Sequence, residues 1–143
     1  MILLDTNVLS EQFRAKPDPV VLTWLNDQAL ETLYLSAMTV AELRAGVARM
    51  PAGKKKKLLN ESIEEQLLPL FAGRVLPFDI SCTKSYAELL ATARKAGSGI
   101  AAADAVIAAT AHNGGFIVAT RDTSPFEAAG LKVINPWYKD HEN

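Results

Sequence analysis

The sequence predicts an α/β fold in which helices cover a mainly parallel sheet. Short apolar runs bounded by polar residues alternate with amphipathic stretches of helical length, a pattern typical of a parallel sheet wrapped by helices. The chain has 143 residues, about the size of one domain, and contains neither an internal repeat nor a low-complexity linker. We therefore expect a single domain spanning residues 1–143.

Five apolar runs are predicted to be strands. Each is too short for a helix, and most are rich in β-branched or aromatic residues. They are Ile2 to Leu4, Thr32 to Leu35, Arg74 to Phe78, Phe116 to Ala119 and Lys132 to Ile134.

Five longer stretches between these runs are predicted to be helices, because apolar residues recur in them at helical spacing. They are Pro19 to Gln28, Thr39 to Met50, Lys54 to Leu68, Ser81 to Lys95 and Ile100 to His112. Pro51 and Gly53 separate two of these helices, Gly73 precedes the third strand, and Gly114 with Gly115 ends the alanine-rich helix.

The composition excludes some classes of protein. A net charge of −1 argues against a protein that coats nucleic acid through overall positive charge, so any such contact must be local. The local candidate is the run Lys54 to Lys57, which opens a helix where the helix dipole disfavours cations. The alternative is a solvated face balanced by Glu61, Glu64 and Glu65. The hydrophobic fraction of 49% leaves apolar surface for a partner or an oligomer.

The other conspicuous side chains favour structural roles. A single cysteine, Cys82, excludes an internal disulfide and a zinc site of the usual kind, which fits a reducing cytoplasm. The first residues carry no basic leader and meet a charge at Asp5, so we expect neither a secretion signal nor a membrane span there. Trp24 and Trp137 are expected to pack, and His112 to cap a helix end.

Two acidic residues follow the first two strands. Asp5 directly follows the first strand, and the carboxyl end of a strand is where ligands bind in an open parallel sheet. Asp5 could instead be only a turn or helix-capping residue. Thr39-Val-Ala-Glu42 has the form of a capping box, which would place the Glu42 carboxylate in the first turn of the helix after the second strand. Capping and ligand binding are compatible at both positions.

Asp104 lies on the same stripe of a predicted helix as Ile100, Ile107 and Ala111. An unpaired carboxylate on a buried face would cost several kcal/mol or become protonated. It therefore requires a cation, a network of hydrogen-bond donors or a cavity that reaches solvent. A bound metal ion meets this need, and so would an Arg or Lys partner.

Asp122 lies in a loop just after the fourth predicted strand. The following Ser124-Pro-Phe-Glu127 has the form of a short capped helix with proline at its first position, so Asp122 is not needed as its cap. Asp122 is then either a simple loop acid or part of a site.

Considered together, Asp5, Glu42, Asp104 and Asp122 predict a metal site at one edge of the sheet. At about 5 Å separation and an effective dielectric near 20, each pair of like charges costs roughly 3 kcal/mol, so protons or divalent cations must neutralise the cluster. Oxygen ligands of high negative charge suit Mg²⁺ or Mn²⁺. Such a site can activate water and screen charge during hydrolysis of a phosphodiester.

Four segments, in the same order and at the same spacing, resemble the PIN-domain toxins of VapBC toxin–antitoxin pairs, the VapC family. They are Ile2 to Asn7, Ser36 to Leu43, Ile100 to Ala111 and Ala119 to Phe126, and Leu68 to Phe78 with Asn135 to Trp137 resembles the FitB-like branch. The resemblance implies a three-layer α/β/α sandwich with a five-stranded, mainly parallel sheet of order 3-2-1-4-5. That order would place Asp5 and Asp122 on neighbouring strands at the topological switch point.

The resemblance also implies an activity: endonucleolytic hydrolysis of RNA, with tRNA or rRNA as substrate. The four acids would bind one or two Mg²⁺ ions (or Mn²⁺), and Thr6, Asn7 and Thr120 are candidates for orienting water or phosphate. Because water would be the nucleophile, the expected products carry a 5′ phosphate and a 3′ hydroxyl.

The partners implied by the resemblance are a VapB-like antitoxin and a second copy of the chain. A C-terminal segment of the antitoxin would lie in a groove of this chain, with a basic residue in the acidic pocket. The homodimer would form a higher-order complex with the antitoxin. Operator DNA would be bound only through the antitoxin. We expect a cytoplasmic protein without membrane contact.

Two other classes of function remain open. One is a catalytically silent PIN-fold module that binds antitoxin or RNA, against which all four acids argue. The other is a phosphatase or receiver-like domain with its nucleophile at Asp5. Phosphatases of the haloacid-dehalogenase kind expect a second Asp where this chain has Asn7, and no lysine follows a late strand as in receivers.

Overall fold

The central feature of the computed structural model, which describes residues 1–138, is a five-stranded sheet of order β3-β2-β1-β4-β5. All four strand pairs are parallel. The strands are β1 (Ile2–Leu4), β2 (Leu33–Ser36), β3 (Val75–Leu76), β4 (Ile117–Ala119) and β5 (Val133–Ile134). The predicted fold class and strand order are confirmed; β1 has the predicted bounds, and the ends of the other strands differ from the prediction by no more than two residues. Residues 139–143 of the predicted domain lie outside the described residues.

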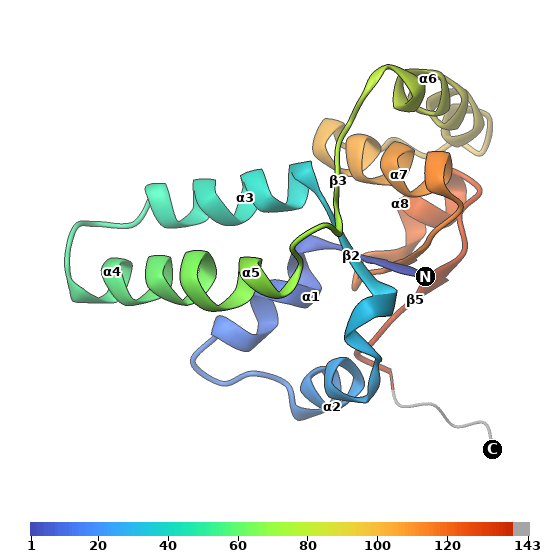
Figure 1. Cartoon of the computed structure of the whole chain (residues 1–143). Coiled ribbons are helices and arrows are strands. Elements are labelled where there is room, and N and C mark those ends of the chain that lie inside the picture. The colour runs from blue at the N-terminus through green and yellow to red at the C-terminus, as the bar shows by residue number, and fades with distance from the viewer. Residues whose placement is uncertain (139–143) are drawn as a thin grey trace.

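The helical segments cover both faces of this sheet (Figure 1). They are α1 (Thr6–Ser10), η1 (Glu11–Phe13), α2 (Pro19–Asp27), η2 (Leu30–Thr32), α3 (Ala37–Ala48), α4 (Lys54–Glu61), the π-helical η3 (Ser62–Leu67), α5 (Leu68–Leu70), α6 (Ile80–Lys95), α7 (Ala102–Gly114) and α8 (Thr123–Ala128). The five predicted helices are present with altered ends. The sequence did not predict α1, η1 or η2, because segments of three to five residues carry little periodicity.

Two apolar cores lie on opposite faces of the sheet, which makes the fold a three-layer sandwich. Successive residues of a strand point to opposite faces, and in β1 Leu3 belongs to one core while Leu4 belongs to the other. The core around Leu4 is filled from α1 to α5, and the core around Leu3 is filled from α6, α7 and α8. This arrangement brings the carboxyl end of β1 to the centre of one edge of the sheet.

Helix α3 begins earlier than predicted, and the capping box predicted for Thr39 and Glu42 is wrong. The cap is Ser36, the last residue of β2, whose hydroxyl accepts a hydrogen bond from the Thr39 backbone N–H at 3.0 Å. Ser36 is buried and lies three residues before Thr39. Because its hydroxyl already caps the free backbone N–H groups, the helix begins before Thr39 could act as the cap. Glu42 consequently lies in the second turn of α3.

Two other helix starts also differ from the prediction. Helix α7 begins at Ala102, so Ile100 precedes it, although Ile107 and Ala111 are fully buried as expected. Helix α8 begins at Thr123, which places Asp122 at its N-cap position with no side-chain capping bond, and the predicted start with Pro125 at the first position is wrong. Gly115 ends α7 in the left-handed conformation with φ of 71°, as the Gly114-Gly115 pair predicted.

Helices α3 and α4 form a hairpin that projects from the rest of the domain (Figure 1). The α4 helix continues without a break through η3 into α5, so the predicted helix from Lys54 extends to Leu70. Arg44 on α3 donates two hydrogen bonds of 2.9 Å each to the Glu64 carboxylate on η3. This bidentate ion pair links the two halves of the hairpin.

The remaining conspicuous residues have structural contacts. Cys82 is buried, Trp24 and Trp137 pack against the core around Leu4, and His112 in the last turn of α7 lies 3.1 Å from the Ser85 hydroxyl through Nδ1. Among residues 1–138, no helix is both long enough and apolar enough to cross a bilayer.

Candidate active site

Asp5 lies at the centre of the candidate site, between the carboxyl end of β1 and the start of α1. Its side chain is 5% exposed and accepts two hydrogen bonds, at 2.8 Å from the Thr6 backbone N–H and at 2.7 Å from the Thr120 hydroxyl. Asp5 is therefore a helix cap, as one interpretation predicted, and it also contacts a residue 115 positions away in the sequence.

Burial is the main reason why the pKa of Asp5 is raised to about 6. The hydrogen bonds from Thr120 and Thr6 oppose this rise, whereas the negative charges of Asp104 and Glu42 add to it. Since these two acids act on Asp5 through space, the fold has brought together carboxylates from the end of β1, from α3 and from α7.

Glu42 is held by a chain of hydroxyl groups. The Thr6 hydroxyl donates to Glu42 Oε1 and lies 3.2 Å from the Thr39 hydroxyl, and the Ser36 hydroxyl donates to Thr39 at 3.2 Å. Ser36 and Thr39 are fully buried. Thr6, a predicted supporting residue, thus connects the two acids, because its backbone N–H bonds Asp5 while its hydroxyl bonds Glu42.

Asp104 lies in the first turn of α7 and is half-buried. Burial raises its pKa, and the negative charges of Glu42 and Asp122 raise it further. Within residues 1–138 the salt bridges join Arg14 to Glu11 and Arg44 to Glu64, so no described Arg or Lys neutralises Asp104. The alternative of a core Asp paired with a basic residue finds no support in the described part of the chain.

Asp122 is the exposed member of the group. Its backbone N–H donates to the Thr120 hydroxyl at 3.1 Å, so Thr120 connects Asp122 to Asp5. The third predicted supporting residue, Asn7, accepts a 3.4 Å hydrogen bond from the Arg121 backbone N–H and so connects the start of α1 to the same loop.

The four carboxylates form a group without a closed ligand shell. The negative charges of Glu42 and Asp104 raise the pKa of Asp5, and those of Glu42 and Asp122 raise the pKa of Asp104. Nevertheless, no three Asp, Glu, His or Cys side chains in residues 1–138 converge closely enough to hold one ion together. A group of oxygen donors without basic partners, with one carboxyl pKa of about 6, fits the chemistry of a divalent cation.

Several residues of this region were not predicted. Ser36 and Thr39 support Glu42 through their hydroxyl groups. The only sequence signal that pointed to these two residues was that either hydroxyl could cap the helix. Glu11 is 2% exposed, and the backbone N–H of Asp18 lowers its pKa through a 2.7 Å hydrogen bond. No pattern in the sequence marks Glu11 as buried. The Arg121 guanidinium lies over the Trp137 ring at 5.1 Å.

Comparison with known proteins identifies the family of this chain. The family model described as "PIN domain" matches residues 2–131, which is most of the chain. The chain belongs to the PIN-domain family. The parallel sheet of order β3-β2-β1-β4-β5 is thus the PIN fold, as the four sequence segments indicated.

Individual PIN proteins are similar over nearly their whole length. "VapC ribonuclease Y4jK" of Sinorhizobium fredii is 60% identical, and the match covers 96% of this chain and 98% of that protein. "Toxin FitB" of Neisseria gonorrhoeae is 54% identical over 96% of this chain and 99% of that protein. The solved "Structure of FitAB bound to IR36 DNA fragment" matches with a TM-score of 0.96 and 52% identity, covering 100% of both chains.

Proposed function

We propose that this chain is the toxin of a type II toxin–antitoxin pair and acts as a Mg²⁺-dependent endoribonuclease. The observation that carries the proposal is the buried Asp5 carboxylate, which lies among three further acids and has no described basic partner. Similarity to a named ribonuclease and to a named toxin, each over 96% of the chain, supports the choice of reaction and of biological role.

Asp5, Glu42 and Asp104 would hold the metal, with Asp122 as an outer fourth ligand. When bound, Mg²⁺ (or Mn²⁺) supplies an electrophile that lowers the pKa of water and offsets the charge of the phosphate. The carboxyl group of Asp5, with a pKa of about 6, is mostly ionised at neutral pH and available to a cation. The acids would have to move closer together to complete the ligand set, since no three described acids converge as they stand.

The neighbouring hydroxyls position these ligands. Thr120 donates to one oxygen of Asp5, and the Thr6 backbone N–H donates to the other, which fixes the rotation of the carboxylate. The Thr6 hydroxyl donates to one oxygen of Glu42, Oε1, and so helps to position this carboxylate. We assign Thr6 and Thr120 as positioning residues that keep the acids preorganised. Asn7 holds the loop that carries Asp122.

The direct test is cleavage of RNA by the purified chain. Wild type is incubated with tRNA and rRNA fragments in Mg²⁺ or in EDTA, beside Asp104→Asn and a charge-matched control, Glu88→Gln, at an exposed position on α6. We expect Mg²⁺-dependent cleavage by wild type and by the control, none by Asp104→Asn, and products with 5′ phosphates and 3′ hydroxyls. Full turnover by Asp104→Asn would contradict the site assignment.

A wild-type chain that cuts none of these RNAs would instead be the catalytically silent PIN-fold module. Such a module would still bind antitoxin or RNA without divalent ions. Binding in EDTA together with the absence of cleavage in Mg²⁺ or Mn²⁺ therefore separates the two functions.

The proposed partners follow from the same similarity. We propose that the chain is cytoplasmic, forms a homodimer, binds a VapB-like antitoxin and reaches operator DNA only through that antitoxin, since a solved neighbour is a FitAB assembly bound to a DNA fragment. Size-exclusion chromatography with light scattering tests the dimer. Gel-shift assays with operator DNA test the last point, and a shift by the chain alone would contradict it.

A further inference from the structure

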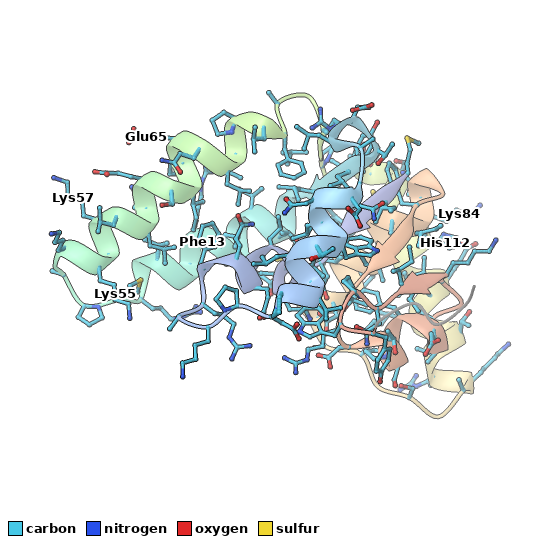
Figure 2. All side chains as sticks on the ribbon, turned by 90° about the horizontal axis from the view of Figure 1, so that it is seen from below. Phe13, Lys55, Lys57, Glu65, Lys84 and His112 are labelled. Atoms are coloured by element: carbon cyan, nitrogen blue, oxygen red, sulfur yellow. The ribbon has the colours of Figure 1, made fainter. Side chains whose placement is uncertain are left out.

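The lysine run Lys54 to Lys57 lies at the far end of the α3–α4 hairpin, which carries Glu42 on α3. Figure 2 shows Lys55 and Lys57 at one end of the molecule, opposite Lys84 and His112. Lys54, Lys55 and Lys57 are exposed, and α4 begins at Lys54. The positively charged tip formed by these three residues is here called the lysine tip.

Folding alone does not account for this placement. The lysine tip occupies the first turn of α4, where the helix dipole disfavours cations, and Gly53 provides no side-chain cap. Lys56 has a structural contact, since its ammonium group donates at 3.4 Å to the Ala48 carbonyl at the end of α3. The hydrogen bonds and salt bridges of residues 1–138 include none from the side chains of the lysine tip.

The glutamates nearby do not neutralise the lysine tip. Glu64, which the sequence offered as a balancing charge, is engaged by Arg44 in the bidentate pair across the hairpin. Glu61 and Glu65 form no salt bridge within the described residues. The lysine tip therefore presents three ammonium groups to solvent in a chain whose net charge is −1.

The hairpin connects the lysine tip to the acidic group. The Arg44–Glu64 pair and the buried Val47 and Ile63 hold η3, which continues α4, against α3. Glu42 lies six residues before the end of α3, which at about 1.5 Å per residue is roughly 9 Å along the helix axis. Stacked nucleotides rise about 3.4 Å each along one strand, so the lysine tip lies about three or more nucleotides from Glu42.

We propose that the lysine tip binds backbone phosphates of the substrate RNA at least three nucleotides from the cleaved bond. This inference rests on the proposed ribonuclease function and adds to it a second contact, which favours substrates longer than a few nucleotides. Repulsion between phosphates and the carboxylates near Asp5 weakens binding at the acidic site, and a distant cationic contact offsets that loss. The lysine tip reads no sequence, since phosphate contacts carry no base information.

The test measures RNA binding without divalent ions, so that cleavage plays no part. The probe is a fluorescein-labelled 24-nucleotide RNA stem-loop, titrated in EDTA from 50 to 300 mM salt. The variant Lys54→Gln/Lys55→Gln/Lys57→Gln is compared with Lys84→Gln/Lys95→Gln/Lys132→Gln, which removes three equally exposed lysines elsewhere. Urea unfolding of both variants is the folding control, and loss of the lysine tip should slightly stabilise α4.

We expect the lysine-tip variant to bind the stem-loop on the order of tenfold or more weakly, while the control variant stays near wild type. The dependence of log K on log salt should decrease by about 2 to 3, because each lost phosphate contact removes about 0.7 to 0.9.

Three results would overturn the proposal. They are an equal loss of affinity for the stem-loop in the two variants, an unchanged salt dependence of binding in the lysine-tip variant, or no binding of the stem-loop by wild type. Failure of the proposed ribonuclease function looks different. In that case wild type would bind the stem-loop in EDTA through the lysine tip but would not cut tRNA or rRNA when Mg²⁺ is added.

Discussion

Replacing Asp5 by Asn should stabilise the metal-free protein at neutral pH while it abolishes cleavage. The shift in the pKa of Asp5 from 3.8 to about 6 means that burial and the nearby acids disfavour its charged form. At about 1.4 kcal/mol per pKa unit, ionised Asp5 costs the fold roughly 3 kcal/mol. Asn can still cap α1, but a neutral acceptor weakens the hydrogen bonds from Thr6 and Thr120, which costs about 1 kcal/mol.

The expected net gain is about 2 kcal/mol in the free energy of unfolding, or about 6 °C in Tm for a chain of this size. The gain should depend on pH with a definite sign. Below about pH 4, Asp5 is protonated in both folded and unfolded wild type, so the gain disappears. As the pH rises from 4 to 6, the unfolded state loses its proton first and wild type loses stability relative to Asp5→Asn. Above the folded pKa of about 6 the difference is constant.

Divalent ions should reverse the order of stability. Mg²⁺ that binds only the folded protein adds RT ln(1 + [Mg²⁺]/Kd), which is about 2.7 kcal/mol at 100 times the Kd. Wild type should gain this stability, whereas Asp5→Asn, which lacks a central carboxylate, should gain little.

Urea unfolding from pH 4 to 8, in EDTA and in Mg²⁺, measures all of these quantities. The charge-matched control is Asp27→Asn, at an exposed position at the end of α2. A mutant that is no more stable than wild type at pH 7.5 in EDTA would refute the electrostatic reasoning. If Mg²⁺ leaves the free energy of unfolding of the wild type unchanged, the metal site is refuted.

Three further predictions concern individual contacts. Thr120→Val should cost about 1 to 3 kcal/mol in the free energy of unfolding. It should also move the acid limb of the pH–rate profile to higher pH, because the Thr120 hydrogen bond lowers the pKa of Asp5 and its removal raises that pKa; an unshifted profile would contradict this. Gly114→Ala should cost about 1 to 3 kcal/mol in urea unfolding, since a Cβ would clash with the Phe116 ring, whereas Gly46→Ala, which meets no atom within 4 Å, should not destabilise. Arg44→Ala should cost less than about 1 kcal/mol because the pair with Glu64 is partly exposed; a larger loss would indicate a wider role in the hairpin.

Much of the fold could be predicted because its signals are local. The apolar runs around Leu3 and Val118 are buried strands, and Gly115 ends α7 in a conformation that favours glycine. The same local signals misplaced the start of α3. Ser36 and Thr39 both carry a hydroxyl that can cap a helix, and only the position of β2 in the sheet decides which of them meets the free N–H groups.

The sequence by itself determined the order of strands and helices along the chain and the positions of the four acids near the ends of these elements, because periodicity and turn residues act over a few positions. Only the tertiary structure decided that the Thr120 hydroxyl holds Asp5 and that Thr6 holds Glu42. Only the tertiary structure also raised the pKa of Asp5 and left the lysine tip without a described salt bridge. The physical reason is that burial and charge interactions depend on distance in space, and residues 115 positions apart in the chain become neighbours only when the sheet forms.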